Sequence, residues 1–162
     1  ASSNPFLLPA VENACYPEFG IIKTYLYLEQ LRFGDELHVE LDIAETDFYY
    51  RADVQPLVEN AVKHAFFRPG GNKLDVSVSV RGGQEVTIIV ADNGVGMDTA
   101  HFEEVLSGRC EGHFGLYSVR RCMELLCGGQ YSIEAISEKM KGTEIILRYN
   151  AGCISANGRE HD

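Results

Sequence analysis

Apolar and polar positions alternate along this chain in a way that predicts five β-strands. Such alternation, or a dense run of β-branched residues, is typical of a strand with one or both faces buried. The second and third runs are separated by Gly82-Gly83, which predicts an antiparallel hairpin. The five runs are Leu37 to Ile43, Leu74 to Val80, Glu85 to Ala91, Tyr131 to Ile136 and Thr143 to Tyr149.

Apolar residues at helical spacing predict four helices around these strands. In the first, Glu18 to Phe33, apolar residues occupy more than one face, which suits a segment of a longer coiled or bundled helix, and Gly34 can cap its end. Asp98 can cap the third helix, and Gly128-Gly129 ends the fourth. The remaining helices are predicted at Val54 to Phe67, Asp98 to Leu106 and Gly115 to Leu126.

The second of these helices has one apolar stripe and one polar face. The apolar stripe consists of Val54, Leu57, Val58, Ala61, Val62, Ala65 and Phe66. Pro56 fits the first turn, with Gln55 expected outside helical geometry before it. Asn60, Lys63 and His64 share the polar face, where an amide, an ammonium and an imidazole could hold a metal ion and phosphate oxygens. A solvated helix face explains the same residues, and for this helix alone it is the better interpretation.

Length and composition fit one globular domain. The chain has 162 residues, of which 45% are hydrophobic and 23% are charged. Its formal net charge of -10 disfavours a protein that binds nucleic-acid phosphates or an anionic membrane. No apolar run approaches the roughly 20 residues that cross a bilayer, and no signal peptide is recognisable. Residues 1–17, 44–53 and 150–162 lack periodicity, and we expect a loosely ordered lead-in, a loop and a flexible tail.

The cysteines and histidines show no ligand pattern. The five cysteines contain no C-x-x-C pair, and their odd number does not suit a disulfide framework, so we expect the reduced cysteines of a cytosolic protein. The histidines are scattered, and no metal-ligand spacing such as H-E-x-x-H is present.

The stretch from Ala91 to Met97 follows the third predicted strand and reads ADNGVGM. At the end of a buried strand the carboxylate of Asp92 would be held rigidly, and it could accept a hydrogen bond from an amino group. Gly94 and Gly96 let the backbone turn sharply and lie close against a flat ligand. An ordinary strand-to-helix turn explains the same residues, because Asn-Gly and Asp-x-Gly are common turn sequences. The stretch alone leaves both interpretations open.

Four motifs in a fixed order resemble the nucleotide-binding boxes of the gyrase, heat-shock-90, histidine-kinase and MutL superfamily. The closer likeness is to the catalytic domain of LytS-type sensor histidine kinases, and it covers roughly residues 20–149. The motifs are QPLVENAVKH from Gln55, similar to the N box; DNGVGM from Asp92, similar to the G1 box; FGLYSVR from Phe114, similar to the G2 box; and GTE from Gly142, similar to the G3 box.

The resemblance implies an α+β fold, a two-layer α/β sandwich of the Bergerat type whose mixed, mostly antiparallel sheet has helices on one face. Residues 18–34 would end the helix that precedes this domain, and residues 35–149 would form the ATP-binding catalytic domain. Asp92 would accept a hydrogen bond from the adenine amino group, with Thr143 assisting directly or through water. Gly94 and Gly96 would let the backbone approach the base and the ribose.

The phosphate end of the nucleotide is assigned by the same resemblance. Asn60 would bind Mg²⁺ through its amide oxygen, a hard ligand for a hard cation. Lys63 and His64 would face the phosphates. A lid hinged between Gly112 and Gly115 would cover them, and the helix that begins near Leu116 would contribute the positive end of its dipole.

The implied reaction is transfer of the γ-phosphoryl group of Mg-ATP to a histidine on a dimerisation hairpin, with a response regulator as the downstream partner. No histidine precedes Glu18, so we expect a catalytic fragment that binds ATP but does not phosphorylate itself. Dimerisation is expected only in the full-length protein. Family members often cross a membrane, which would leave this domain on the cytoplasmic side.

Two alternatives remain. Hydrolytic members of the superfamily place a glutamate four residues before the asparagine, where this chain has Pro56, and Glu59 is expected to point away from Asn60. A degenerate nucleotide-binding module without turnover is suggested by two departures from the family lid. His113 stands where a glycine is usual, and Ser118 stands where an asparagine is usual.

Overall fold

The computed structural model describes residues 17–43, 54–65, 73–109 and 114–153. Within them the predicted helices and strands are all present, and a short 3-10 turn, Gly34–Glu36, follows the first helix. The predicted loop at 44–53 and the last two residues of the second predicted helix lie outside the described residues. The helices are α1 Pro17–Phe33, α2 Gln55–Ala65, α3 Thr99–Leu106 and α4 Phe114–Cys127, and the strands are β1 Leu37–Ile43, β2 Leu74–Arg81, β3 Glu85–Asp92, β4 Tyr131–Glu138 and β5 Gly142–Asn150.

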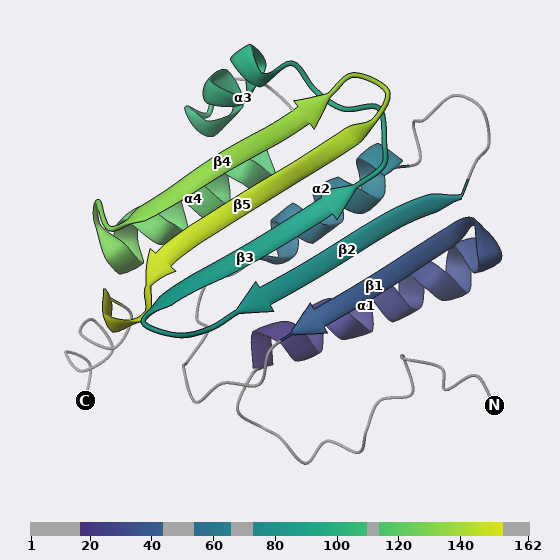
Figure 1. Cartoon of the computed structure of the whole chain (residues 1–162), viewed down its shortest axis with the longest axis horizontal. Coiled ribbons are helices and arrows are strands. Elements are labelled where there is room, and N and C mark those ends of the chain that lie inside the picture. The colour runs from purple at the N-terminus through teal and green to yellow at the C-terminus, as the bar shows by residue number, and fades with distance from the viewer. Residues whose placement is uncertain (1–16, 44–53, 66–72, 110–113, 154–162) are drawn as a thin grey trace.

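The strands form one sheet in the order β1-β2-β3-β5-β4 (Figure 1). Only β1 and β2 run parallel, and the other three pairs are antiparallel. The predicted hairpin of β2 and β3 is confirmed, and so is the expected mixed, mostly antiparallel sheet. The middle strand, β3, is hydrogen-bonded along both edges, which makes its end a rigid place to hold a side chain.

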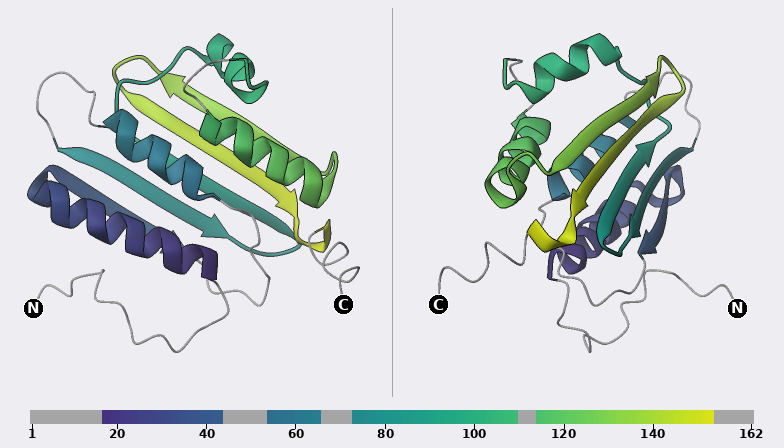
Figure 2. Two further views of the ribbon diagram at one scale, coloured as in Figure 1. Left: turned by 180° about the vertical axis from the view of Figure 1, so that it is seen from behind. Right: turned by 60° about the vertical axis from the view of Figure 1, so that its left-hand side comes forward.

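Helices α1, α2 and α4 cover one face of the sheet, and no helix of the described residues covers the other face (Figures 1 and 2). Helix α3 packs against α4 and the edge strand β4. Because side chains alternate along a strand, every second residue of the inner strands points towards the helices. The inner strands contribute these side chains to the core, and they are Val76, Val78, Val80, Val86, Ile88, Val90, Ile145, Leu147 and Tyr149.

The described side chains of the apolar stripe of α2, from Val54 to Val62, are buried as predicted, but the start of this helix differs from the prediction. The Val54 carbonyl accepts hydrogen bonds from Leu57 N–H at 3.0 Å and Val58 N–H at 3.3 Å, so Gln55 is the first helical residue. The prediction that Gln55 lies outside helical geometry is therefore wrong. Pro56 is still tolerated in the first turn, because the first N–H groups of a helix have no partner within it.

The predicted helix ends are confirmed by backbone geometry. Gly34 and Gly128 have φ angles of +58° and +56°, which a glycine adopts without strain. The Asp98 side chain accepts a hydrogen bond from Ala100 N–H at 2.9 Å and so caps α3. At the other end of the chain, β5 extends to Asn150, and the buried Ala151 donates its N–H to the Gln84 carbonyl. The segment predicted to be a tail thus begins with packed residues.

No helix in the described ranges is both long enough and apolar enough to span a membrane.

Candidate functional site

Asp92 lies at the end of the central strand β3. It pairs with Val76 of β2 on one side and with Thr143 of β5 on the other. The alternation along β3 places its side chain on the helix-covered face, in line with the buried Val90. The carboxylate is therefore held on a rigid element, as the sequence predicts.

Two backbone N–H groups hold the Asp92 carboxylate. Oδ1 accepts a hydrogen bond from Gly94 N–H at 2.8 Å, and the backbone of Thr143 provides a second bond. Both bonds favour the charged form, yet burial outweighs them and raises the pKa of Asp92 to about 6. A carboxylate has about four acceptor positions, so these two bonds leave room for a further donor.

Thr143 is buried beside Asp92, and Ser137 of β4 fixes its hydroxyl. Thr143 is 5% exposed, and its Oγ1 lies 2.9 Å from Ser137 Oγ. Ser137 Oγ donates to the Gly142 carbonyl at 3.0 Å and accepts from Met97 N–H at 2.7 Å. Since the single Ser137 proton goes to Gly142, the Thr143 hydroxyl donates to Ser137, and its own lone pairs remain available to a donor.

The turn after β3 packs directly against the turn between β4 and β5. A Cβ atom on Gly142, whose φ is +121°, would lie 2.0 Å from the Asp92 carbonyl oxygen, and one on Gly96 would lie 2.3 Å from the Glu138 carbonyl oxygen. Both distances are impossible for a real side chain, so these positions require glycine. In addition, Met140 N–H donates to the Val95 carbonyl at 2.7 Å. The backbone around Asp92 is thus held by the turn between β4 and β5.

Asn93 secures the same turn from the other side. Its side chain accepts a hydrogen bond from Asp75 N–H at 2.9 Å and donates to the Lys73 carbonyl at 3.0 Å. Together with Ser137, it is a supporting residue that sequence reasoning missed. Asn93 lies inside the predicted motif and offered a signal, whereas Ser137 is an unremarkable strand serine far from the motif in sequence.

The polar face of α2 lies towards the start of α4. A Cβ atom on Gly115 would lie 3.3 Å from the Pro56 Cβ, so the first turns of the two helices touch. Asn60 follows Pro56 by one helical turn and therefore lies on the same side of α2. Asn60 is half-buried and Lys63 is exposed. Figure 1 and the left view of Figure 2 place the C-terminal end of α2 near the end of β3, which carries Asp92.

The structure does not describe every predicted site residue. The His64 side chain and residues 110–113, which include Gly112 and His113, lie outside the described residues. Leu116 is 3% exposed and its side chain belongs to the core, so only its backbone can face a ligand. The described residues therefore bring Asp92, Gly94, Gly96 and Thr143 together at the end of β3, with Asn60 and Lys63 on the neighbouring α2 and Gly115 at the start of α4.

Comparison with known proteins yields sensor histidine kinases. YpdA of Escherichia coli is 38% identical over 128 residues, which are 76% of this chain and 22% of YpdA. YesM of Bacillus subtilis is 32% identical over 136 residues, 80% of this chain and 22% of YesM. LytS of Staphylococcus aureus, a sensor histidine kinase/phosphatase, is 41% identical over 86 residues, 49% of this chain and 14% of LytS. The chain spans less than half the length of the curated relatives it matches.

Solved structures agree on the fold. The catalytic domain of histidine kinase ThkA superposes with a TM-score of 0.62 at 17% identity, over 81% of this chain and 89% of that domain. The histidine kinase AdeS of Acinetobacter baumannii gives a TM-score of 0.61 at 18% identity, over 82% of this chain and 64% of AdeS. These likenesses confirm the expected two-layer fold of a histidine kinase catalytic domain.

A family model covers most of the chain. The model described as "Histidine kinase-, DNA gyrase B-, and HSP90-like ATPase" matches residues 51–152. This range contains all four motifs, from the polar face of α2 to the start of β5. The chain therefore belongs to the histidine kinase-, DNA gyrase B- and HSP90-like ATPase family.

Proposed function

We propose that this chain is the ATP-binding catalytic domain of a sensor histidine kinase, and that it positions Mg-ATP for transfer of the γ-phosphoryl group to a histidine on a dimerisation hairpin. The observation that carries the proposal is the Asp92 carboxylate, which is half-buried at the end of the central strand and held by backbone N–H groups. A response regulator is the proposed downstream partner, and the cytoplasm is the proposed location.

Asp92 is suited to recognise adenine. Its carboxylate accepts hydrogen bonds only, and the exocyclic amino group of adenine is a donor. Guanine carries an acceptor oxygen at the corresponding position, so the same carboxylate would repel it. The Thr143 hydroxyl, with its proton engaged by Ser137, offers a second acceptor directly or through water. Gly94 and Gly96 are proposed to let this backbone lie against the base and ribose.

The polar face of α2 is suited to the phosphates and their cation. No three histidine, cysteine, aspartate or glutamate side chains among the described residues are grouped as a metal site. Mg²⁺ in nucleotide sites often takes few protein ligands beside phosphate and water, so the single amide of Asn60 fits that ion. Bound Mg²⁺ would neutralise phosphate charge. Lys63 adds a cation, and we keep His64 as a phosphate contact and Gly112 and Gly115 as the lid hinge.

The test is calorimetric titration of ATP and GTP into the chain, with and without Mg²⁺. Replacing Asp92→Asn keeps the shape of the side chain but turns one acceptor oxygen into a donor. We expect ATP affinity to fall at least about 100-fold, because a site whose selectivity depends on one hydrogen bond binds its ligand much more weakly when that bond cannot form. Asp98→Asn is the matched control, since it makes the same chemical change at the cap of α3, where asparagine serves equally well.

Two results would contradict the proposal. One is unchanged ATP affinity in Asp92→Asn, and the other is GTP affinity equal to that of ATP. With binding established, a LytS-type dimerisation hairpin supplied in trans tests the transfer step. Phosphate on the hairpin histidine supports a kinase, and tight binding without transfer supports the nucleotide-binding module.

ATP hydrolysis is the less favoured alternative. Glu59 lies nearest to the asparagine of α2, but it is exposed, and its carboxylate accepts a hydrogen bond from Gln55 Nε2 at 2.9 Å. With Pro56 in the position of the hydrolytic glutamate, the described part of α2 presents no base that could activate water beside Asn60. Steady release of free phosphate in the absence of a hairpin would favour hydrolysis.

A further inference from the structure

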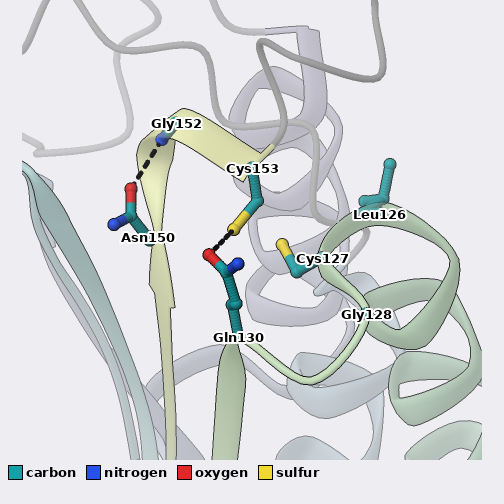
Figure 3. Close-up of a pocket in the computed structure, with 7 residues that line it drawn as sticks. All are labelled: Leu126, Cys127, Gly128, Gln130, Asn150, Gly152 and Cys153. Carbon is teal, nitrogen blue, oxygen red and sulfur yellow. Dashed lines mark hydrogen bonds between the residues drawn. The ribbon is translucent and has the colours of Figure 1, made fainter.

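Two cysteines that are distant in sequence line the same pocket (Figure 3). Cys127 is the last residue of α4, and Cys153 lies just beyond the end of β5. Asp92 pairs with Thr143 near the start of that same strand, so the length of β5 separates the two places. The pocket has a volume of about 520 Å³ and is also lined by Leu126, Gly128, Gln130, Asn150 and Gly152.

The two thiols lie beside one another, and one of them is hydrogen-bonded to Gln130. The Cys153 thiol donates to Gln130 Oε1 at 3.3 Å, and Cys127 lines the same pocket. Figure 3 shows the Cys153 sulfur directed at Gln130, with the Cys127 sulfur next to it.

Their unequal exposure gives the two cysteines different roles. Cys127 is 7% exposed, and burial and the neighbouring Cys153 raise the pKa of its thiol to about 12. Cys153 is half-buried and borders the pocket. The thiolate is the nucleophile in disulfide exchange, so the more accessible Cys153 would react first with a reagent from solution.

We propose that Cys127 and Cys153 form a redox-active thiol pair, which closes to a disulfide by exchange with a small-molecule disulfide of the glutathione class. The Cys153 thiolate attacks one sulfur of the oxidant, forms a mixed disulfide and releases one thiol. The Cys127 thiol then loses its proton to solvent and attacks the Cys153 sulfur, which forms the internal disulfide and releases the second thiol. The protein loses two electrons and two protons, and one molecule of oxidant is reduced to two thiols.

The third described cysteine, Cys122, cannot replace Cys153 as the partner of Cys127. It precedes Cys127 by five residues on the same helix, which separates their Cα atoms by about 8–9 Å, beyond the roughly 7 Å that a disulfide spans. A disulfide between α4 and the segment after β5 would instead join the C-terminal end of the helix to the end of the sheet. The N-terminal end of the same helix carries Gly115 of the proposed lid.

The experiment incubates the native chain in mixtures of oxidised and reduced glutathione, followed by alkylation of free thiols, intact mass measurement and peptide mapping. We expect a product that has lost the mass of two hydrogen atoms and a linked peptide that joins Cys127 to Cys153. Cys122→Ser is the matched control and should give the same linked peptide. In Cys127→Ser the reaction should stop at a glutathione adduct on Cys153.

A second measurement tests whether the folded structure, and not proximity along the chain, brings Cys127 and Cys153 together. In denaturant the preference for the 127–153 pair should be lost, because Cys122 is then the nearer neighbour of Cys127 along the chain. Absence of the linked peptide in the native chain at the most oxidising ratio would overturn the proposal. An unchanged preference in denaturant would also overturn it, as would a stable adduct on Cys153 that Cys127 never resolves.

Discussion

The carboxylate of Asp92 receives two backbone hydrogen bonds, and burial still raises its pKa to about 6. The environment that would make it selective for an amino group therefore opposes its ionisation in the ligand-free fold. A group whose pKa is raised by folding stabilises the fold only while it is protonated. At neutral pH the charged Asp92 should therefore reduce the stability of the ligand-free domain.

The raised pKa of Asp92 predicts that the unfolding free energy of the ligand-free domain depends on pH. The pKa of Asp92 rises from its ordinary value of 3.8 to about 6, so its favourable contribution is complete below about pH 4 and is lost as the pH rises through about 6. Between these limits we expect wild type to lose about 2 kcal/mol of unfolding free energy relative to Asp92→Asn, a figure reduced for partial solvent exposure. Urea unfolding of both proteins across this range measures the difference. A constant difference would contradict the prediction.

The backbone conformation of Gly142 and its close approach to Asp92 lead to a second prediction at the residue scale. With a φ of +121° and an added Cβ only 2.0 Å from the Asp92 carbonyl oxygen, Gly142→Ala must displace β3 or β5. We expect a loss of about 3 kcal/mol or more in urea unfolding, together with weaker ATP binding. The matched control is Gly129→Ala, where nothing lies within 4 Å of the added Cβ, and the change should stay within about 1 kcal/mol. Equal losses of unfolding free energy in the two variants would show that the close approach of Gly142 to the Asp92 carbonyl has no energetic consequence.

Among the elements, helix α1 has apolar residues on two faces, and the two faces differ in burial. Ile22 and Leu26 are 1% and 0% exposed and pack into the core, whereas Ile21, Leu28 and Leu31 are 54–64% exposed. One stripe therefore attaches the helix to this domain, and the second stripe is not used by the described part of it. A second apolar stripe is what a segment of a longer coiled or bundled helix would need, which is how this helix is interpreted from its sequence.

The two stripes should respond differently to truncation. Leu26→Ala removes a fully buried side chain and should lower the free energy of unfolding by about 2–5 kcal/mol. Leu28→Ala makes the same change on the exposed stripe of the same helix, and we expect a change within about 0.5 kcal/mol. Chemical denaturation of both variants is the measurement. A similar loss in the two would mean that the exposed stripe is also packed in solution.

Elements whose pattern is local were predictable from sequence, and contacts between distant segments were not. The strands from Leu74 and Glu85 are specified by their own alternation, and Asp98 caps its helix within a few residues. Ser137 orients Thr143 and holds Met97, but these contacts form only when β4 and β5 return beside β3. The motif predicted Leu116 in the site, and its burial shows that its side chain belongs to the core.

At the scale of the whole molecule, the proposed site draws on segments that meet only in the folded state. Asp92 and Thr143 come from two strands of the sheet, Asn60 and Lys63 from α2, and Gly115 from α4. The unfolded chain cannot assemble these groups, so a nucleotide that binds them must stabilise the entire fold. Thermal unfolding therefore reports on the site without any assumption about turnover.

Mg-ATP at about 100 times its dissociation constant should stabilise the domain by about 2.7 kcal/mol, which for a chain of this size raises the melting temperature by about 5–10 °C. Asp92→Asn should lose most of this shift, while Gly129→Ala, which leaves all four segments unchanged, should keep it. GTP should give little shift, because the Asp92 carboxylate opposes its acceptor oxygen. If Mg²⁺ alone or GTP raised the melting temperature as far as Mg-ATP, the stabilising contacts would lie outside the Asp92 turn. Since the end of β3 is held by both neighbouring strands, a ligand bound there resists unfolding of the sheet and of the helices packed on it together.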